Sequence, residues 1–310
     1  MHCFLFTLRV KLFFGEESLE RSEQMSRIRI LADSTCDLSQ GLIEEYGITI
    51  LPLNIVMEDT CYLDGVETTP DAIYAWAAAN RTTPKTAAPG LEAAIEFLRP
   101  FAETGDEVIF FGISEQMSST CQVLRLAASE LECEDRVVVM DSMNLSTGIG
   151  LQVLYAAELT KEGVSLRELE EKMKQYRERV RASFIVDTLT YLQRGGRCSA
   201  VTALLGNTLK LKPRIEVEKG KMGVGQKYRG VSKKTVMAYV KDMEEALHKA
   251  DRKRVFITHS GIADEIVEEV KRYLESLQHF ESIYITRAGG VISSHCGPGT
   301  LGVLFVEDNN

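Results

Sequence analysis

The sequence lacks long hydrophobic runs and any excess of positive charge. No stretch of about 18 apolar residues occurs in its 310 residues, so a membrane-spanning helix is not expected. The 45 acidic residues outnumber the 36 basic ones and leave a net charge of -9. A phosphate backbone demands a basic surface, so nucleic acid is not the expected partner. Apolar residues make up 45% of the chain, which is enough for one large or two ordinary domains.

Paired cysteines and clustered histidines are also missing. The seven cysteines are scattered singly without a C-x-x-C pair, and the five histidines show no ligand spacing with one another. A structural zinc site is therefore not expected. An odd number of isolated thiols suits a reducing compartment, which predicts a cytoplasmic protein.

The N-terminal segment does not have the features of a signal peptide. In residues 1–14 (MHCFLFTLRVKLFF), Arg9 and Lys11 interrupt the apolar run, and no small-residue cleavage site follows. Met25 directly precedes SRIRILADS, which opens a strand. We expect residues 1–25 to be a non-native or disordered extension and Met25 to be the natural start. The alternative is a short lipid-facing or partner-binding segment.

Short apolar runs alternate with amphipathic stretches from residue 27 onward. Helices are predicted over 165–180, where Ser165 and Glu168 have capping-box spacing, over 234–250 and over 263–277. The alternation predicts an α/β fold with mainly parallel sheets. A weak boundary near residue 162 divides the chain into an N-terminal α/β domain, 26–162, and a C-terminal α/β domain, 163–310. The predicted strands are 28–32, 108–111, 137–140, 184–186, 255–258, 283–285 and 301–306.

Small polar loops follow three strands of the first half, at 33–35, 114–120 and 141–144. In open α/β sheets, ligands bind at the carboxyl ends of strands, where such loops gather. Each loop alone is explained better by helix capping. The three together favour a ligand site.

Two segments of the first half have the features of an anion site. Ser118, Ser119 and Thr120 precede a helical pattern at 121–131, so hydroxyls and free backbone N–H groups are expected to point at one spot. Thr86 precedes Ala-Ala-Pro-Gly, and Pro89 is a candidate first residue of a helix. The only cation in either segment is Lys85, which favours a singly charged carboxylate over a di- or triphosphate.

Two turns of the second half add further candidate ligands. His295 opens His-Cys-Gly-Pro-Gly-Thr, where Gly297 and its neighbours predict a tight turn that lets the backbone approach a ligand. Arg197 ends the segment 192–197 (LQRGGR). Without a ligand, these are a turn histidine and a solvated basic turn, and the residues alone do not decide between the two interpretations.

The ordered set of motifs resembles the DegV family over about residues 26 to 307. No single motif is specific, but their order and spacing along the whole chain are. The motifs are DSTCDL at 33–38, KTAAP at 85–89, MSST at 117–120, LQRGGR at 192–197 and HCGPG at 295–299.

The resemblance implies two α/β domains with a ligand site at their interface, and a function as a lipid carrier. Proteins of this family hold a long-chain fatty acid and act as the binding subunit of a bacterial fatty-acid kinase, whose separate subunit binds ATP. No cofactor is implied other than the bound fatty acid. By this resemblance Thr86 and Ser118 hydrogen-bond the carboxylate, while His295 completes the head site.

The same resemblance assigns further residues to ligand and partner. Arg197 supports the head site, and Ser119 and Gly297 lie beside it. Arg229, in the segment 228–231 (YRGV), looks like the exposed arginine that docks the kinase. Lys233 and Lys234 add positive charge nearby.

This chain departs from the family pattern at two places. The family usually has Ser-Gly-Thr-Tyr-Gln where residues 118–122 read SSTCQ, and many members have Thr-Ser-Gln-Pro where residues 86–89 read TAAP. Neither change removes a proposed carboxylate contact. Both leave the preferred chain length and saturation open.

Two enzymatic alternatives compete with a carrier. A serine-type acyl hydrolase would use Ser118 as nucleophile, His295 as base and Asp33 or Asp141 as the orienting group, but no G-x-S-x-G elbow surrounds any serine. A nucleotide enzyme would need a G-x-x-x-x-G-K-[ST] loop, which is absent. The glycines at 220–225 lie in a hairpin-like context instead. The prediction is therefore a binding subunit with no catalytic residue of its own.

Overall fold

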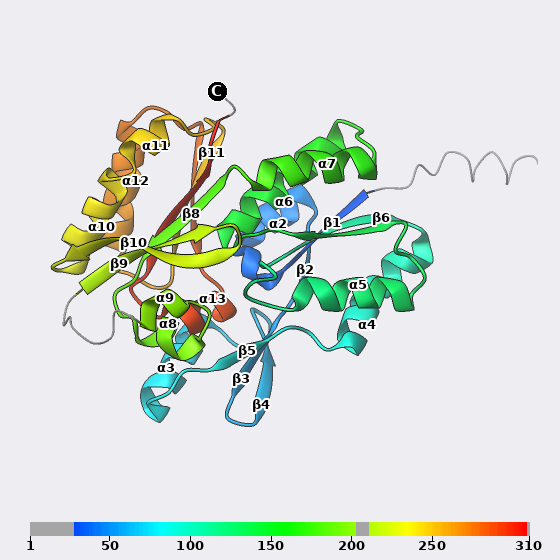
Figure 1. Ribbon diagram of the computed structural model, residues 1–310, viewed down its shortest axis with the longest axis horizontal. Coiled ribbons are helices and arrows are strands. Elements are labelled where there is room, and N and C mark those ends of the chain that lie inside the picture. Colours follow the sequence, from blue (N-terminus) through cyan, green and yellow to red (C-terminus); the bar gives the residue numbers. More distant parts are fainter. Residues whose placement is uncertain (1–27, 203–210, 309–310) are drawn as a thin grey trace, which may run out of the picture.

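The computed structural model describes residues 28–202 and 211–308 (Figure 1). The predicted extension at 1–25 lies outside the described residues. The chain forms three β-sheets with helices packed around and between them. Within the described residues, no helix is both long and apolar enough to cross a membrane.

The first sheet is parallel throughout, as predicted for the N-terminal half. Its strands lie in the order β2-β1-β6-β7, and the buried run of β6 occupies the centre with β1. Continuous apolar strands of this kind are buried on both faces, because helices cover a parallel sheet from either side. The strands are β1 (Ile28–Asp33), β2 (Thr49–Leu51), β6 (Glu107–Gly112) and β7 (Val137–Asp141).

The second sheet corrects the expectation of mainly parallel pairing. Its order is β10-β9-β8-β13-β11-β12, and only β11 and β12 run parallel. The last strand, β13, inserts between β8 and β11 and runs opposite to both. The strands are β8 (Val180–Ile185), β9 (Leu211–Glu218), β10 (Lys221–Arg229), β11 (Arg254–His259), β12 (Ser282–Arg287) and β13 (Leu301–Val306).

The turn between β9 and β10 explains one antiparallel pair. Lys219 and Gly220 both have positive φ, 49° and 78°, as a two-residue hairpin turn requires. The hairpin-like context predicted for the glycines at 220–225 is thereby confirmed.

A small third sheet was not predicted, although it carries one wall of the ligand site. It has the order β4-β3-β5 and is antiparallel throughout. The strands are β3 (Asn54–Met57), β4 (Thr60–Leu63) and β5 (Lys85–Ala87). Its strands are only three or four residues long and too weakly patterned to be recognised in the sequence.

One helix, α6 (Thr147–Lys161), is buried on nearly every side and packs against strands of both large sheets (Figure 1). The other helices are peripheral or short. They are η1 (Ser34–Cys36), α2 (Gln40–Tyr46), α3 (Pro70–Asn80), α4 (Leu91–Thr104), α5 (Thr120–Glu130), α7 (Leu166–Arg177), α8 (Thr190–Gly195), α9 (Ser199–Thr202), α10 (Ser232–Lys241), α11 (Glu244–His248), α12 (Asp264–Ser276) and α13 (Gly290–Cys296).

Two of the three predicted helices are confirmed, and the third is divided. Ser165 caps α7 by accepting a hydrogen bond from the Glu168 N–H at 3.3 Å, and α12 lies within its predicted range. The segment predicted as one helix over 234–250 is α10 and α11, because the chain tightens at Met243, whose N–H donates to the Val240 carbonyl three residues back.

The described strands of the parallel sheet lie within 28–141 and those of the six-stranded sheet within 180–306. The two domains 26–162 and 163–310, with a boundary near residue 162, stay a prediction.

Candidate ligand-binding site

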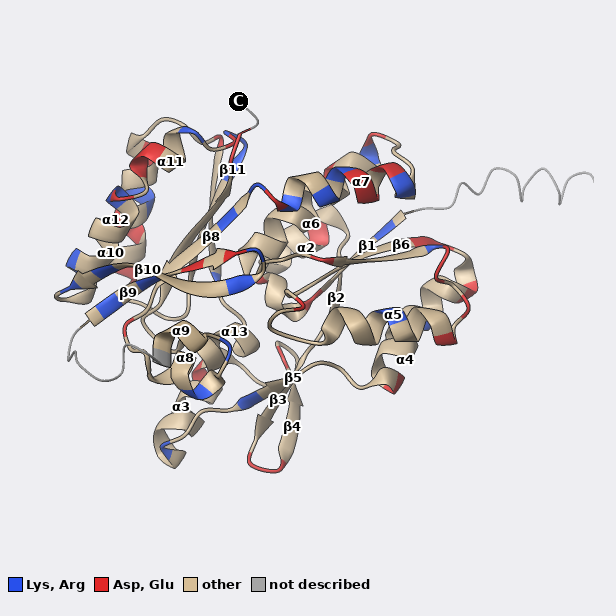
Figure 2. Ribbon diagram, viewed as in Figure 1, with Lys and Arg blue, Asp and Glu red and all other residues tan. Residues whose placement is uncertain are grey.

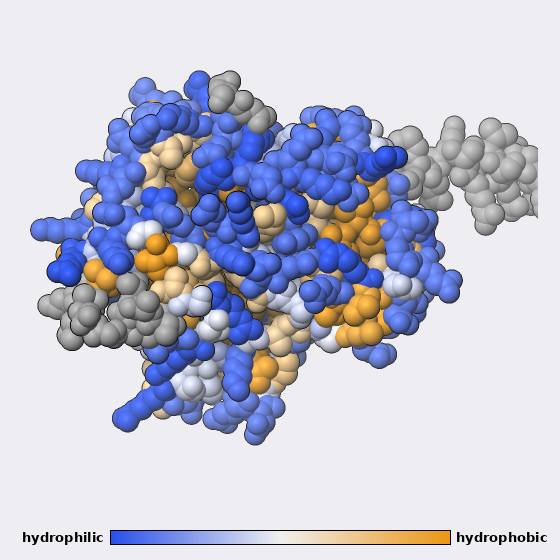
Figure 3. Space-filling model, in the orientation of Figure 1, coloured by the Kyte–Doolittle hydropathy of each residue, from blue (hydrophilic) through white to orange (hydrophobic). Residues whose placement is uncertain are grey.

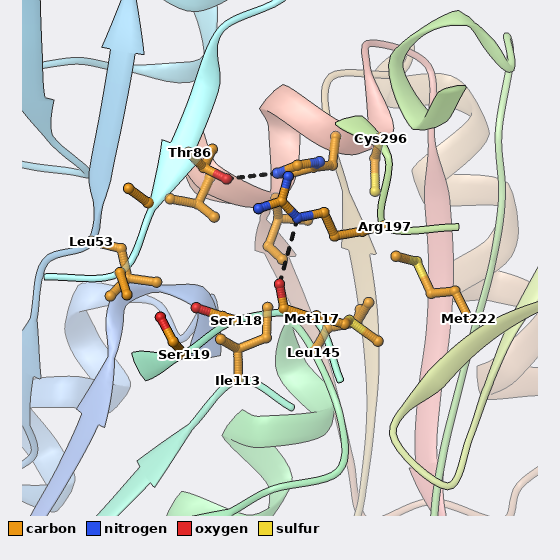
Figure 4. A pocket seen from close by; sticks show the side chains of 15 residues that line it. Leu53, Thr86, Ile113, Met117, Ser118, Ser119, Leu145, Arg197, Met222 and Cys296 are labelled. Atoms are coloured by element: carbon orange, nitrogen blue, oxygen red, sulfur yellow. Dashed lines mark hydrogen bonds between the residues drawn. The ribbon is translucent and has the colours of Figure 1, made fainter. Parts of the chain in front are cut away.

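A cavity of about 290 Å³ lies where the parallel sheet, the small sheet and α13 meet (Figure 4). The loop that follows β6 supplies one side, as the strand-end argument predicted. Residues of the other two predicted loops, 33–35 and 141–144, do not line the cavity, although Leu145 just after the third does. Most of its wall is apolar, with five polar or charged side chains at one region. The apolar lining is Leu53, Ala87, Ala88, Ile113, Met117, Leu145, Met222, Val291, Ile292 and Cys296, and the polar lining is Thr86, Ser118, Ser119, Arg197 and His295.

Thr86 lies on a strand and not before a helix. It sits in the middle of β5, opposite Ile55 of β3, and the next helix, α4, begins at Leu91 with Gly90 as its N-cap. The expectation that Pro89 opens that helix is therefore wrong. The backbone of Thr86 is held by the small sheet, which fixes the direction in which its hydroxyl points.

Thr86 and His295 meet in the wall of the cavity although 209 residues separate them. The Thr86 Oγ1 and His295 Nε2 atoms lie 2.7 Å apart, in hydrogen-bond contact. Burial lowers the pKa of His295 to about 4, and the nearby Arg197 guanidinium acts in the same direction. At neutral pH the imidazole is therefore uncharged.

The other ring nitrogen of His295 indicates which tautomer is present. Nδ1 is buried and has no hydrogen-bond partner. An orphaned N–H is rarer than an orphaned lone pair, so the proton belongs on Nε2, where Thr86 Oγ1 accepts it. The Thr86 hydroxyl then has its own proton left to donate to a ligand.

Gly195 of α8 makes room for this ring. A Cβ atom at that position would lie 2.2 Å from His295 Nδ1, well inside any real contact. Sequence reasoning recognised the Gly-Gly-Arg turn but missed this role of its first glycine. No local signal reveals it, because the ring comes from a distant segment.

Ser118 and Ser119 form the opposite side of the head region. The Ser118 Oγ lies 2.9 Å from Thr120 Oγ1 and accepts from the Thr120 N–H. Ser119 is the exposed N-cap of α5, with no hydrogen bond from its side chain to the helix. Both hydroxyls therefore lie beside the free N–H groups at the start of an 11-residue helix.

Arg197 links the loop after β6 to the end of α8. Its Nε donates to the Met117 carbonyl at 3.5 Å and its Nη1 to the Gly195 carbonyl at 2.9 Å. The cation thus lies at the head region. Gly297 does not line the cavity. It ends α13 with φ 71°, and a Cβ there would meet the Tyr191 ring at 2.6 Å.

Three buried aspartates hold the walls of the cavity. Asp33 accepts from the Ile113 N–H at 2.8 Å, which anchors the loop before Ser118. Asp37 accepts from the Gly289 N–H at 2.8 Å, and Asp64 from the Gly290 N–H at 2.7 Å, which anchors the start of α13.

Burial shifts the acidity of these carboxyl groups. Desolvation raises the pKa of Asp33 to about 6 and that of Asp37 to about 8, and it raises the pKa of Asp64 as well. The sequence analysis placed Asp33 in a strand-end loop and in a family motif, identified Asp37 only as part of that motif, and missed Asp64.

The predicted docking residues lie outside the cavity. Arg229 is exposed at the end of β10, and Lys234 is exposed on α10. Lys233 forms an ion pair with Glu269 at 2.8 Å. Across residues 28–202 and 211–308, no group of three or more His, Cys, Asp and Glu side chains is arranged to hold a metal ion.

Comparison with known proteins places this architecture in a family. The DegV family model matches residues 27–308. A DegV domain-containing protein of Clostridium perfringens is 34% identical over 284 residues, covering 92% of this chain and all of the relative.

Two solved structures share both the fold and sequence similarity. A fatty-acid-binding DegV family protein from Thermus thermophilus has a TM-score of 0.84 at 32% identity, covering 91% of this chain and all of that one. A stearic-acid-binding protein from Eubacterium ventriosum has a TM-score of 0.78 at 27% identity, covering 91% of this chain and 98% of the other. The chain belongs to the DegV family.

Proposed function

We propose that this protein binds a long-chain fatty acid, with the carboxylate at Thr86, Ser118 and His295 and the acyl chain in the apolar part of the cavity. The observation that carries the proposal is the Thr86–His295 hydrogen bond in the wall of a mostly apolar cavity. The fatty-acid-binding relatives from Thermus thermophilus and Eubacterium ventriosum support it.

The head region suits a single negative charge. The hydroxyls of Thr86 and Ser118 donate hydrogen bonds, and hydrogen bonds to a charged acceptor are stronger than those between neutral groups. Ser119 adds the start of α5, where orphaned N–H groups stabilise an anion. Arg197 supplies the positive charge, and one cation is sufficient for a carboxylate.

The apolar lining suits a long chain. Each buried methylene contributes about 0.8 kcal/mol, so a long acyl chain supplies roughly 10 kcal/mol before the costs of binding. Met117 and Met222 lie on this lining, and their unbranched side chains adapt to irregular shapes. Affinity then comes from the tail, whereas the head bonds set its orientation.

The proposal includes a partner that performs the chemistry. The chain has no P-loop motif, so phosphorylation of the bound carboxylate requires a separate ATP-binding kinase subunit. Figure 2 shows Lys and Arg along β9, β10 and α10, which is where the proposed docking residues Arg229, Lys233 and Lys234 lie. We assign these three residues to kinase docking.

The surface and the cysteines bear on the cellular compartment of the protein. The face in Figure 3 is largely hydrophilic, with separate apolar patches. Every described cysteine is a free thiol. Thiols that stay reduced are typical of the cytoplasm, which we propose as the compartment.

A serine hydrolase is less well supported by the same geometry. The Ser118 hydroxyl pairs with Thr120, while His295 Nε2 pairs with Thr86. A nucleophile needs its base within hydrogen-bond reach, and the base needs an orienting group on its other nitrogen. The Nδ1 atom of His295 has no such partner.

Extraction of the purified protein with organic solvent, followed by mass spectrometry, tests the proposal. A near-stoichiometric fatty acid is expected. The Ser118→Ala variant should retain less fatty acid with an unchanged fold, because one donor to the carboxylate is gone. Ser129→Ala is the matched control, since Ser129 is exposed near the C-terminal end of α5, the helix that follows Ser118, and its hydroxyl donates to Glu134.

An empty extract together with no uptake of added fatty acid would refute the proposal. Equal retention by the Ser118→Ala and Ser129→Ala variants would remove Ser118 from the head site. Hydrolysis of an acyl ester that the Ser118→Ala variant abolishes would favour the hydrolase instead.

A further inference from the structure

The head loop, residues 113–119 between β6 and α5, carries Ser118 and is organised around the backbone of Ser114. The Ser114 N–H donates to the Asn144 carbonyl at 3.0 Å. The Ser114 carbonyl accepts from the N–H groups of Met117 at 2.8 Å and Ser118 at 3.1 Å. The backbone position of Ser118 therefore depends on where Ser114 lies.

The side chain of Ser114 is bound to a distant hairpin. Its Oγ donates to the carbonyl of Gly220, 106 residues further along the chain, at 2.8 Å. The same Oγ accepts from the Gln116 N–H at 3.2 Å, so the hydroxyl is used both as donor and as acceptor. Ser114 and Gly220 are both buried, and a hydrogen bond lost at a buried position is not readily replaced by water.

The turn between β9 and β10 fits closely against the loops of the parallel sheet. Gly220 has φ 78°, and a Cβ atom there would lie 2.5 Å from Ser114 Oγ and 3.6 Å from Met143 Cα. Two residues further on, Met222 lines the ligand cavity together with Met117 of the head loop (Figure 4). The hairpin of the six-stranded sheet therefore contacts the head loop at its turn and adds to the cavity wall.

We propose that Ser114 is a positioning residue for the head site. It is bound to the hairpin turn through its hydroxyl and to Ser118 through its carbonyl, and so holds the Ser118 hydroxyl where it meets the ligand carboxylate. This inference rests on the proposed function and adds a determinant of head-group recognition from the other half of the chain. A hydrogen bond weakens steeply with poor distance and angle, so a displaced Ser118 should weaken binding of the charged head and leave the contacts of the apolar chain unchanged.

The ratio of the affinities for myristate and 1-tetradecanol measures this head-group recognition, because the two ligands have chains of equal length and differ at the head. Ser114→Ala should lower the preference for myristate by about two- to tenfold, which corresponds to one ordinary hydrogen bond. The affinity for the alcohol should stay nearly the same. An unchanged ratio, or an equal loss for both ligands, would overturn the inference, since a merely structural role weakens both alike.

The Ser118→Ala variant shows whether Ser114 acts through Ser118. In that background, Ser114→Ala should cause no further loss of the preference for myristate. A loss as large as in the unaltered protein would also overturn the inference, because Ser114 would then act on another part of the site. Failure of the unaltered protein to bind myristate would instead refute the proposed function.

Gly220→Ala tests the same contact from the hairpin and keeps the proposal open to refutation if Ser114→Ala does not fold. The new Cβ atom would displace Ser114 Oγ, so the preference for myristate should fall here too. Gly163→Ala is the matched control, because Gly163 has φ 80° and a Cβ there meets nothing within 4 Å. It introduces the same backbone strain without the contact. Equal preferences for myristate in the two glycine variants would contradict the proposal.

Discussion

Gly195 faces the ring of His295, and replacing it by alanine tests how tightly α8 positions the head site. The new methyl carbon would lie 2.2 Å from His295 Nδ1 and 3.1 Å from Cε1. Either the ring or α8 must move. Movement of the ring breaks the hydrogen bond between His295 and Thr86.

The Gly195→Ala substitution has two opposing effects on the free energy of unfolding: higher helix propensity and overpacking. Alanine is ordinarily favoured over glycine in a helix by about 0.8–1.0 kcal/mol. Overpacking a buried site costs about 1–3 kcal/mol. The expected net loss of unfolding free energy is therefore about 0–2 kcal/mol. Binding is affected separately. Loss of the Thr86–His295 hydrogen bond, which orients the Thr86 hydroxyl toward the carboxylate, should weaken fatty-acid affinity roughly ten- to hundredfold.

Chemical denaturation and a fatty-acid binding titration measure the two effects. Gly41→Ala is the matched control, because Gly41 lies in α2 and a Cβ there meets nothing within 4 Å. That variant should gain stability and keep its affinity. If Gly195→Ala behaved in the same way, the proposed contact between Gly195 and His295 would be wrong.

Two further predictions concern pH and the partner. Because burial raises the pKa of Asp37 to about 8, the folded state holds its proton over a range in which the unfolded state has lost it. The contribution of Asp37 to unfolding free energy is present below about pH 4 and decreases as pH rises to about 8. Denaturant titrations across this range should show a smaller decrease for Asp37→Asn, and an equal decrease would contradict the assignment. Arg229→Ala should leave fatty-acid affinity unchanged and slow phosphorylation by the kinase subunit, measured against Lys227→Ala on the same exposed strand; a loss of lipid binding would show that Arg229 is not a docking residue.

Sequence patterns predicted a helix or strand well where the residues of that one segment are enough to determine it. The strands β6, β7 and β13 contain continuous runs of residues without polar side chains, at 108–111, 137–140 and 301–306, because a strand covered on both faces has few polar positions. The start of α7 follows from Ser165, whose side chain satisfies a free N–H of the first turn.

The sequence pattern did not predict whether neighbouring strands pair parallel or antiparallel. A run of β-branched residues has the same pattern whichever way it pairs, and β13 enters the second sheet antiparallel to both neighbours. The three-residue strand β5 was missed for a related reason. Its pairing with β3 depends on a segment about 30 residues away, and the Pro-Gly that follows favoured a helix start instead.

The sequence by itself determined the set of chemical groups: hydroxyls at Thr86 and Ser118, an imidazole at His295 and a guanidinium at Arg197, in an order that identified the family. Only the tertiary structure decided which of these groups meet. The contact between Thr86 and His295, 209 residues apart, depends on the packing of α13 against the small sheet.

The same holds for the aspartates that anchor the start of α13 and for the wall of the cavity. A hydrogen bond needs its atoms within about 3 Å, and a cavity wall depends on volumes contributed by distant segments. Leu145 and Cys296 have the same local pattern as any core residue. Their place in the cavity wall follows only from the tertiary structure, which brings segments about 150 residues apart together.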